Sequence, residues 1–253
     1  MNNIKTFENF NNQDIFTYIK NNDIESIKNY IDSGYNLNIK NKYDYTPLML
    51  AAVDNIEIIK LLLNSGADVN IKNIGGYTAL MLAIINNNIE ICKILLNFGA
   101  DPNKQNNNGN TALIYAVENN DIELIKLLLK FGANVDKQNN DGNTALIKAA
   151  SNNYVEFVKF LLNFGADIDK QNNDGNTALI IASRNNNREI IELLLNYHAD
   201  EFILNDNNDS FYDYLNDEDK KYFLKEYPNK IHNAILYWYK KPFTDFIKDY
   251  NIK

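Results

Sequence analysis

An all-α solenoid of stacked helix-turn-helix units with β-hairpin loops is predicted by three observations on the sequence. Threonines that precede alanine-rich segments recur every 33 residues, at Thr111, Thr144 and Thr177. Glycines that follow leucine-rich segments recur with the same period, at Gly66, Gly99, Gly132 and Gly165. Within each period the apolar residues have the spacing of two short helices. A fixed period of this length with such content indicates a repeat architecture.

Residues 137–169 show the pattern of one unit most fully. The hydroxyl of Thr144 is suited to cap a first helix that carries small apolar residues over 145–150. A more apolar second helix over 155–162 is expected to end at Gly165, because glycine tolerates a left-handed stop.

Two turns complete the unit. Asn152 and Asn153 are a turn signal between the helices, and Asn is favoured at positive φ. Residues 140–143 (NDGN) predict a tight hairpin turn before the first helix. A hairpin and two short helices cannot cover their own apolar faces, so the unit requires neighbours like itself.

Five segments in register carry the same motif: NKYDYTPLMLAA, NIGGYTALMLAI, NNNGNTALIYAV, NNDGNTALIKAA and NNDGNTALIIAS. They resemble the ankyrin repeat family, whose signature is Asp-x-x-Gly-x-Thr-Pro-Leu-His. The resemblance implies an ankyrin repeat domain over 13–227. Its predicted parts are an N-terminal cap repeat (13–38), full repeats (39–70, 71–103, 104–136, 137–169 and 170–200) and a degenerate C-terminal cap (201–227).

The sequence departs from that signature at defined positions. The Asp before the turn is Asn, which keeps an acceptor for local hydrogen bonds; these are Asn41, Asn73, Asn106, Asn139 and Asn172. The signature His is replaced by an apolar residue in every copy, so any hydrogen bonds of that His between repeats are lost and more apolar packing is expected in their place; these residues are Met49, Met81, Ile114, Ile147 and Ile180. His198 stands where the other repeats have the helix-ending Gly, so an ordinary helix end there is in question. Thr46 and Thr78 are 32 residues apart, which indicates a shortened turn between the helices of the second repeat.

The ends of the chain are less regular. Residues 1–12 form a polar lead whose Phe7 and Phe10 could cover the first helix. The N-terminal cap predicts helices at 14–20 and 24–31. The C-terminal cap predicts helices at 211–215 and 219–226, with Tyr222, Phe223 and Leu224 facing the repeats. An aromatic-rich helical tail over 228–253 either folds over the last repeat or docks a partner.

Composition excludes several classes of function. A net charge of −8 and a pI near 4.9 argue against binding to nucleic acid or an anionic membrane surface, because both require a basic patch. The lone Cys92 permits no intrachain disulfide, and no segment has the run of about 18 apolar residues of a membrane span. We therefore expect a cytoplasmic monomer in a reducing compartment. Abundant Asn, Ile, Lys and Tyr indicate an AT-rich source such as a protist, bacterium or large DNA virus, and the host cytoplasm if viral.

Catalytic and cofactor sites are not expected. His198 and His232 lack Cys or carboxylate partners at metal-ligand spacing, and no phosphate-binding glycine loop is present. Asp141 and Asp174 occupy equivalent turns about 10 Å apart, by the usual spacing of packed helices. Neither has an apolar surrounding to raise its pKa, so we interpret them as solvated turn residues. The sequence predicts a non-enzymatic protein without metal or cofactor.

The resemblance implies that a protein partner binds the concave face, built from hairpin tips and first helices. Carried over by position, the predicted binding residues are Lys42, Tyr43, Tyr45, Tyr77, Tyr115, Lys148 and Arg184. Exposed tyrosines are common in binding hot spots. The alternative for Tyr45 and Tyr77 is packing against adjacent hairpins. The Asn-rich later turns are either scaffold or a polar ladder for a repetitive ligand. A second hypothesis is an adaptor whose tail, 228–253, recruits another machine such as a ubiquitin ligase.

Overall fold

The computed structural model describes residues 14–228 and 230–231 of the 253. The chain divides after residue 133 into two compact units, each of which is described by itself. The helices of the first unit are α1 (Asp14–Lys20), α2 (Ile24–Asp32), α3 (Pro47–Ala51), α4 (Ile56–Asn64), α5 (Ala79–Ile85), α6 (Ile89–Asn97), α7 (Ala112–Glu118) and α8 (Ile122–Lys130). Those of the second unit are α9 (Ala145–Ser151), α10 (Val155–Asn163), α11 (Ala178–Arg184), α12 (Arg188–Asn196), the 3-10 helix η1 (Phe211–Tyr214) and α13 (Asp217–Glu226).

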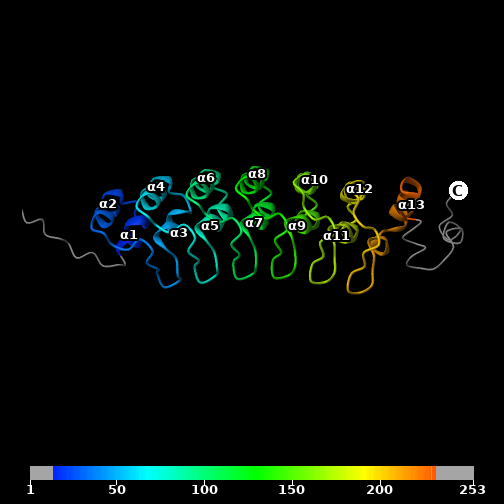
Figure 1. The fold of residues 1–253 in the computed structure, drawn as a ribbon, viewed down its shortest axis with the longest axis horizontal. Coiled ribbons are helices and arrows are strands. Elements are labelled where there is room, and N and C mark those ends of the chain that lie inside the picture. Colours follow the sequence, from blue (N-terminus) through cyan, green and yellow to red (C-terminus); the bar gives the residue numbers. More distant parts are fainter. Residues whose placement is uncertain (1–13, 229, 232–253) are drawn as a thin grey trace, which may run out of the picture. The chain divides into compact units, whose positions relative to one another are not determined.

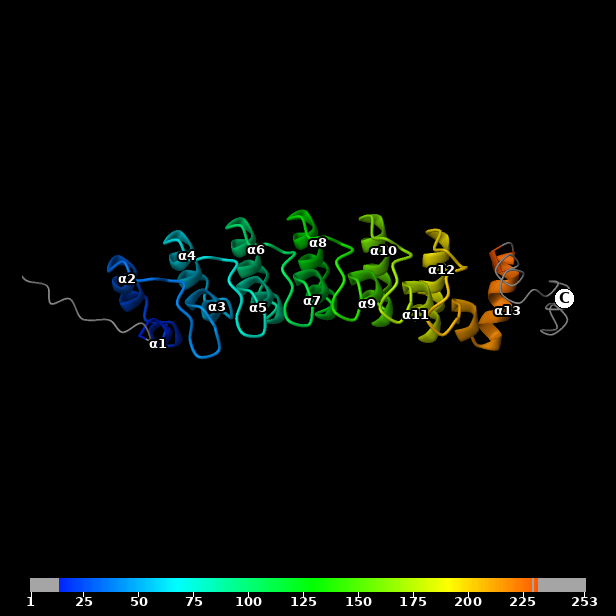
Figure 2. The same cartoon turned by 60° about the horizontal axis from the view of Figure 1, so that its bottom comes forward.

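Helix pairs are stacked in chain order within each unit. In the first unit, α1, α3, α5 and α7 lie side by side, and α2, α4, α6 and α8 form a second row (Figure 1). A view turned by 60° shows the same order (Figure 2). The second unit repeats the arrangement with α9 and α11 beside α10 and α12. In both units the hairpin loops project on the side of the first helices, away from the second helices (Figure 1). This is the predicted helical repeat fold.

Capping threonines begin the first helices, as predicted. The Thr144 hydroxyl accepts a hydrogen bond from the Ile147 amide at 3.2 Å, which satisfies one of the free donors of the first turn. The apolar residues at the signature His position are 0–2% exposed, from Met49 to Ile180. Alanines such as Ala145 and Ala149 are equally buried. Small residues on the first helices therefore let neighbouring repeats approach closely.

Loops between the elements follow the predicted turn chemistry. Asn153 has φ +61°, in the left-handed region. The hairpin of the same repeat is closed by two backbone bonds, from the Asn139 amide to the Asn143 carbonyl at 3.0 Å and from the Gly142 amide to the Asn139 carbonyl at 2.9 Å. These bonds close a loop without a regular β-ladder among the described residues.

His198 ends its helix in the same way as Gly165, although the sequence left this in question. The φ of His198 is +66° and that of Gly165 is +85°. Ala199 donates to the Leu194 carbonyl at 3.0 Å, just as Ala166 donates to that of Leu161. The left-handed region is accessible to a residue other than glycine at a cost of about 1–2 kcal/mol.

Both end repeats are close to the prediction. The N-terminal pair is α1 and α2, which ends one residue later than expected. At the C-terminal end the first element is the 3-10 helix η1, and α13 begins two residues earlier than predicted, at Asp217. Phe223 and Leu224 are buried, whereas Tyr222 is partly exposed beneath the Arg188 guanidinium, 4.6 Å from its ring centre. Arg188 also pairs with Asp219, whose side chain is 5% exposed, and so joins α12 to α13.

No helix among the described residues is both long and apolar enough to cross a membrane. Cys92 is buried in α6, and this burial raises the pKa of its thiol to about 12. The thiol is therefore protonated and unreactive at neutral pH.

Candidate functional site

A surface made of hairpin tips and outward positions of the first helices is the candidate site, and we call it the hairpin face. Two outward positions recur, four and seven residues after each capping Thr. In the first unit they carry Leu50, Val53, Leu82, Ile85, Tyr115 and Glu118. In the second unit they carry Lys148, Ser151, Ile181 and Arg184. The hairpin face is thus mainly apolar in the first unit, whereas three of these four positions are polar or charged in the second.

Hydrogen bonds hold the tips of the first unit in fixed conformations. The side-chain oxygen of Asn73 accepts from the amides of Gly75 and Tyr77 at 3.0 and 2.9 Å. Asn107, in the next hairpin, donates its side-chain amide to the Ile74 carbonyl at 2.9 Å and its backbone amide to that of Gly75 at 3.0 Å. Because each hairpin is bonded to its neighbour, side chains on the tips project from a pre-formed surface.

Four large hydrophobic side chains are exposed on the hairpin face of the first unit. Tyr43 and Ile74, on two successive tips, are 55% and 68% exposed. Val53, two residues after α3, and Ile85, the last residue of α5, occupy equivalent positions in their repeats and are each 43% exposed. The other two exposed large hydrophobics of the described residues are Phe98 and Phe164, at the ends of second helices. Exposed apolar side chains are therefore concentrated on this part of the hairpin face.

Tyr77 and Tyr115 are joined to each other rather than projecting singly. The Tyr115 hydroxyl donates to that of Tyr77 at 3.2 Å and accepts from the side-chain amide of Asn106 at 2.7 Å. The two ring centres are 6.0 Å apart. Loss of hydration, together with the hydrogen bond to Tyr77, raises the pKa of Tyr115 to about 12. Both rings are half-buried, so they offer a partner only part of their surface.

The other predicted residues of the first unit lie at or beside the first tip. Lys42 has its ammonium 4.8 Å from the centre of the Tyr43 ring, a cation–π contact. Tyr45 is half-buried, and its backbone amide donates to the side chain of Asn41. Five of the seven predicted binding residues thus belong to the first unit.

The remaining two predicted residues belong to the second unit. Lys148 is half-buried on α9. Arg184 is exposed at the end of α11, with its guanidinium 5.5 Å from the Tyr214 ring centre. It lines a polar hollow of about 230 Å³ together with Asp174 and Asp206. These carboxylates offset the charge of Arg184, so this hollow has no clear preference for an anion.

Asn-rich tips of the second unit form contacts within the protein. The Asn173 side-chain amide donates to the Asn140 carbonyl at 2.7 Å, and its backbone amide donates to the Asp141 carbonyl at 3.0 Å. Asp141 and Asp174 are exposed turn residues. Among the described residues, no group of three or more His, Cys, Asp or Glu could hold a metal ion. The bonds of Asn173 favour the scaffold interpretation of the later turns.

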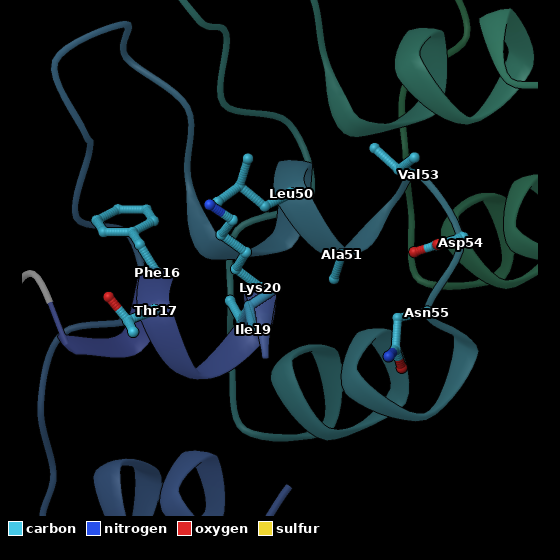
Figure 3. Close-up of a pocket in the computed structure, with 9 residues that line it drawn as sticks. All are labelled: Phe16, Thr17, Ile19, Lys20, Leu50, Ala51, Val53, Asp54 and Asn55. Atoms are coloured by element: carbon cyan, nitrogen blue, oxygen red, sulfur yellow. The ribbon is translucent and has the colours of Figure 1, made fainter. Parts of the chain in front are cut away.

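An apolar groove of about 540 Å³ separates α1 from the end of α3, and it was not predicted from the sequence. Its apolar lining comes from Phe16 and Ile19 on α1 and from Leu50, Ala51 and Val53 at and after α3 (Figure 3). Lys20 and Asp54 also line it. The groove lies at the hairpin face, because Leu50 and Val53 are outward positions. The signal that could have revealed it is the 32-residue spacing of Thr46 and Thr78.

The fold and this face define a helical-repeat interaction protein, and comparisons with known proteins identify its family. The family model described as "Ankyrin repeats (3 copies)" matches three overlapping stretches, 15–106, 55–139 and 113–208. The chain therefore belongs to the ankyrin repeat family. Proteins of this family are typically non-catalytic modules that bind other proteins, and the chain is a protein-interaction module in this sense.

Among solved structures, the chain is similar to the ankyrin repeat domain of Bcl-3, described as a unique member of the IkappaB protein family. The two are 28% identical, with a TM-score of 0.74, and the match covers 83% of this chain and 96% of that one. No match was found among curated protein sequences. In all, 619 solved chains match this chain. Because so many chains share the fold, the similarity establishes the fold but does not identify the binding partner.

Proposed function

We propose that the hairpin face of the first unit, the concave face of this family, binds a partner protein mainly through apolar contacts. The observation that carries the proposal is the concentration of exposed hydrophobics at Tyr43, Ile74, Val53 and Ile85. Several exposed apolar side chains gathered on one face of a protein mark an interaction site more often than singly scattered ones do. The fixed hairpin tips add to this, because a pre-formed surface loses little entropy on binding.

Tyr43 and Ile74 are the side chains on which the proposal depends most. Both side chains are more than half exposed, so they contribute little to the stability of the fold. Truncating either one to Ala is expected to change the free energy of unfolding by no more than about 0.5 kcal/mol. If they are anchors, each truncation should weaken partner binding by about tenfold, which corresponds to about 1.4 kcal/mol. Tyr77 and Tyr115 are poorer test positions, because their mutual contact confounds stability with binding.

Site-specific photo-crosslinking tests the proposal even while the partner is unidentified. A photoreactive phenylalanine analogue is placed at position 43, at position 74 or, as the control, at Phe98. Phe98 is 43% exposed but lies at the end of a second helix. We expect the same discrete protein adduct from host extract at 43 and 74 and not at 98. Absence of any adduct at 43 and 74, or an identical adduct at 98, would refute the proposal.

The adaptor hypothesis concerns the tail over 228–253, of which residues 229 and 232–253 lie outside the described residues. Ile231 is fully buried, and Lys230 donates its ammonium to the Leu195 carbonyl. The start of the tail is therefore part of the packed second unit. A chain shortened after Ile231 keeps these contacts. If it remains as stable as the full chain and loses one specific partner, such as a component of a ubiquitin ligase, the adaptor hypothesis is supported; loss of stability favours a structural cap.

A further inference from the structure

We propose that the N-terminal lead of this chain, taken here together with Gln13 as residues 1–13, docks its two phenylalanines, Phe7 and Phe10, into the groove between α1 and α3. The lead lies outside the described residues. The groove and Asp14, where the lead joins α1, lie within them. This proposal concerns the free protein and does not depend on the proposed function; Val53 belongs to both the groove and the proposed partner surface.

A shortened turn explains why the groove exists at this place. The first helices α5, α7, α9 and α11 each have seven residues, whereas α3 has five. Later repeats place an Asn at positive φ after the first helix, such as Asn87. The second repeat lacks this residue, and the segment after α3 leads directly to Asn55, the N-cap of α4. The end of α3 therefore leaves apolar surface of Leu50 and Val53 open towards α1.

The lead is attached to the wall of the groove. It joins α1 at Asp14, and Phe16 and Ile19 of that same helix line the groove. Phe10 lies four positions before Asp14, so an extended chain spans up to about 14 Å between them. The axis of α1 from Asp14 to Lys20 is only about 9 Å long at 1.5 Å per residue. Phe10 can consequently reach any part of the groove along α1.

The chemistry of the lead fits the groove. Phe7 and Phe10 are its aromatic residues, and those between Phe10 and Asp14 are polar amides. The groove volume of about 540 Å³ is in the range of pockets that enclose small organic molecules, so it has room for aromatic rings. Its lining charges, Lys20 and Asp54, have opposite counterparts in Glu8 and Lys5 of the lead. Attachment in the same chain also gives the lead a local concentration in the millimolar range, on the order of 1 mM.

Cysteine labelling in the full-length protein provides the test. Val53, in the groove, and Ile85, its equivalent in the next repeat, are each 43% exposed, so Val53→Cys and Ile85→Cys form a matched pair. Each cysteine variant is made in two backgrounds, one with the native lead and one that also carries Phe7→Ser and Phe10→Ser. The rate at which the new cysteine reacts with a maleimide is then measured for each protein. Cys92 is buried and serves as an internal monitor of folding.

We expect the two serine substitutions to speed labelling at position 53 about tenfold. If the native lead is docked about nine-tenths of the time, the cysteine is accessible for only about one-tenth of it, and loss of docking removes this protection. Labelling at position 85 should not change. A synthetic peptide of residues 1–13, added to the serine-substituted protein at millimolar concentration, should slow labelling at 53 again. If the substitutions unfold the repeat, Cys92 becomes reactive; the comparison is then made with Phe10→Ser alone.

Equal labelling rates at position 53 with and without the phenylalanines would overturn the proposal. So would slow labelling at 53 that depends on protein concentration and not on the lead, because a second copy of the chain would then be the occupant. Failure of this test leaves the crosslinking result at positions 43 and 74 unaffected, so the two proposals fail separately.

Discussion

Replacing Gly142 by Ala places a methyl group where two hairpins meet, and the cost can be worked out from the contacts. The new Cβ would lie 2.5 Å from both the backbone nitrogen and the side-chain oxygen of Asn173. Gly165 provides the matched control in the same repeat. It also has positive φ, +85° against +76° for Gly142, yet a Cβ there meets nothing within 4 Å. The two substitutions share the backbone strain and differ in the clash.

The shared strain is about 1–2 kcal/mol, the cost of the left-handed conformation for a residue with a Cβ. At Gly142 the hairpins must also separate, which weakens the bonds from Asn173 to the carbonyls of Asp141 and Asn140. Overpacking of this kind adds about 1–3 kcal/mol. We therefore expect Gly165→Ala to lower the free energy of unfolding by about 1–2 kcal/mol and Gly142→Ala by about 2–5 kcal/mol.

Urea unfolding followed by circular dichroism measures both values. Amide hydrogen exchange at Asn173 localises the effect, because its amide bonds the Asp141 carbonyl. Exchange there should accelerate in the Gly142 variant and not in the Gly165 variant. Equal losses of stability for the two variants, within about 0.5 kcal/mol, would refute the close approach of the hairpins as the reason for glycine at this position.

Three further substitutions test individual contacts. His198→Gly should stabilise the protein by about 0.5–1 kcal/mol by removing left-handed strain, read as a higher Tm. Burial, together with the like charge of Asp200, raises the pKa of Asp169. Asp169→Asn should therefore stabilise the protein at pH 7. This advantage should decline as the pH falls through the raised pKa of Asp169 and be gone below about 4, where the carboxyl is protonated in both the folded and the unfolded chain. Arg188→Leu should cost about 1–3 kcal/mol, because it leaves the buried Asp219 carboxylate without its guanidinium.

Each of these has a control or an opposing outcome. A lower Tm for His198→Gly would show that the His198 side chain stabilises the fold by more than its left-handed backbone conformation destabilises it. A stability difference for Asp169→Asn that is independent of pH would contradict the electrostatic explanation. Lys126→Leu removes an exposed ion pair with Glu123, at 2.8 Å, and should change stability by less than about 0.5 kcal/mol. If Arg188→Leu costs no more than this control, Asp219 does not depend on Arg188.

Much of the fold could be predicted from the sequence because its signals are local and repeated. Thr144 caps a helix through its own hydroxyl, and Asn153 adopts positive φ in its own turn, so neighbours are not needed to foresee either. The exposure of the candidate residues could not be predicted in this way. Tyr43 and Tyr77 both belong to hairpins of the first unit, yet Tyr77 meets Tyr115 from the next repeat, and Tyr43 is mostly exposed.

The sequence by itself determined the repeat, the order of helix and turn, and the apolar character of the first tips, since these depend on residue type and spacing along one chain. The tertiary structure decided what depends on distances between repeats. It showed that Asn173 contacts the hairpin at Gly142, that Arg188 is paired with Asp219, and that a five-residue α3 leaves a groove beside α1. A missing residue can be counted in the sequence, but the space that it leaves is fixed only when the neighbouring helices are packed.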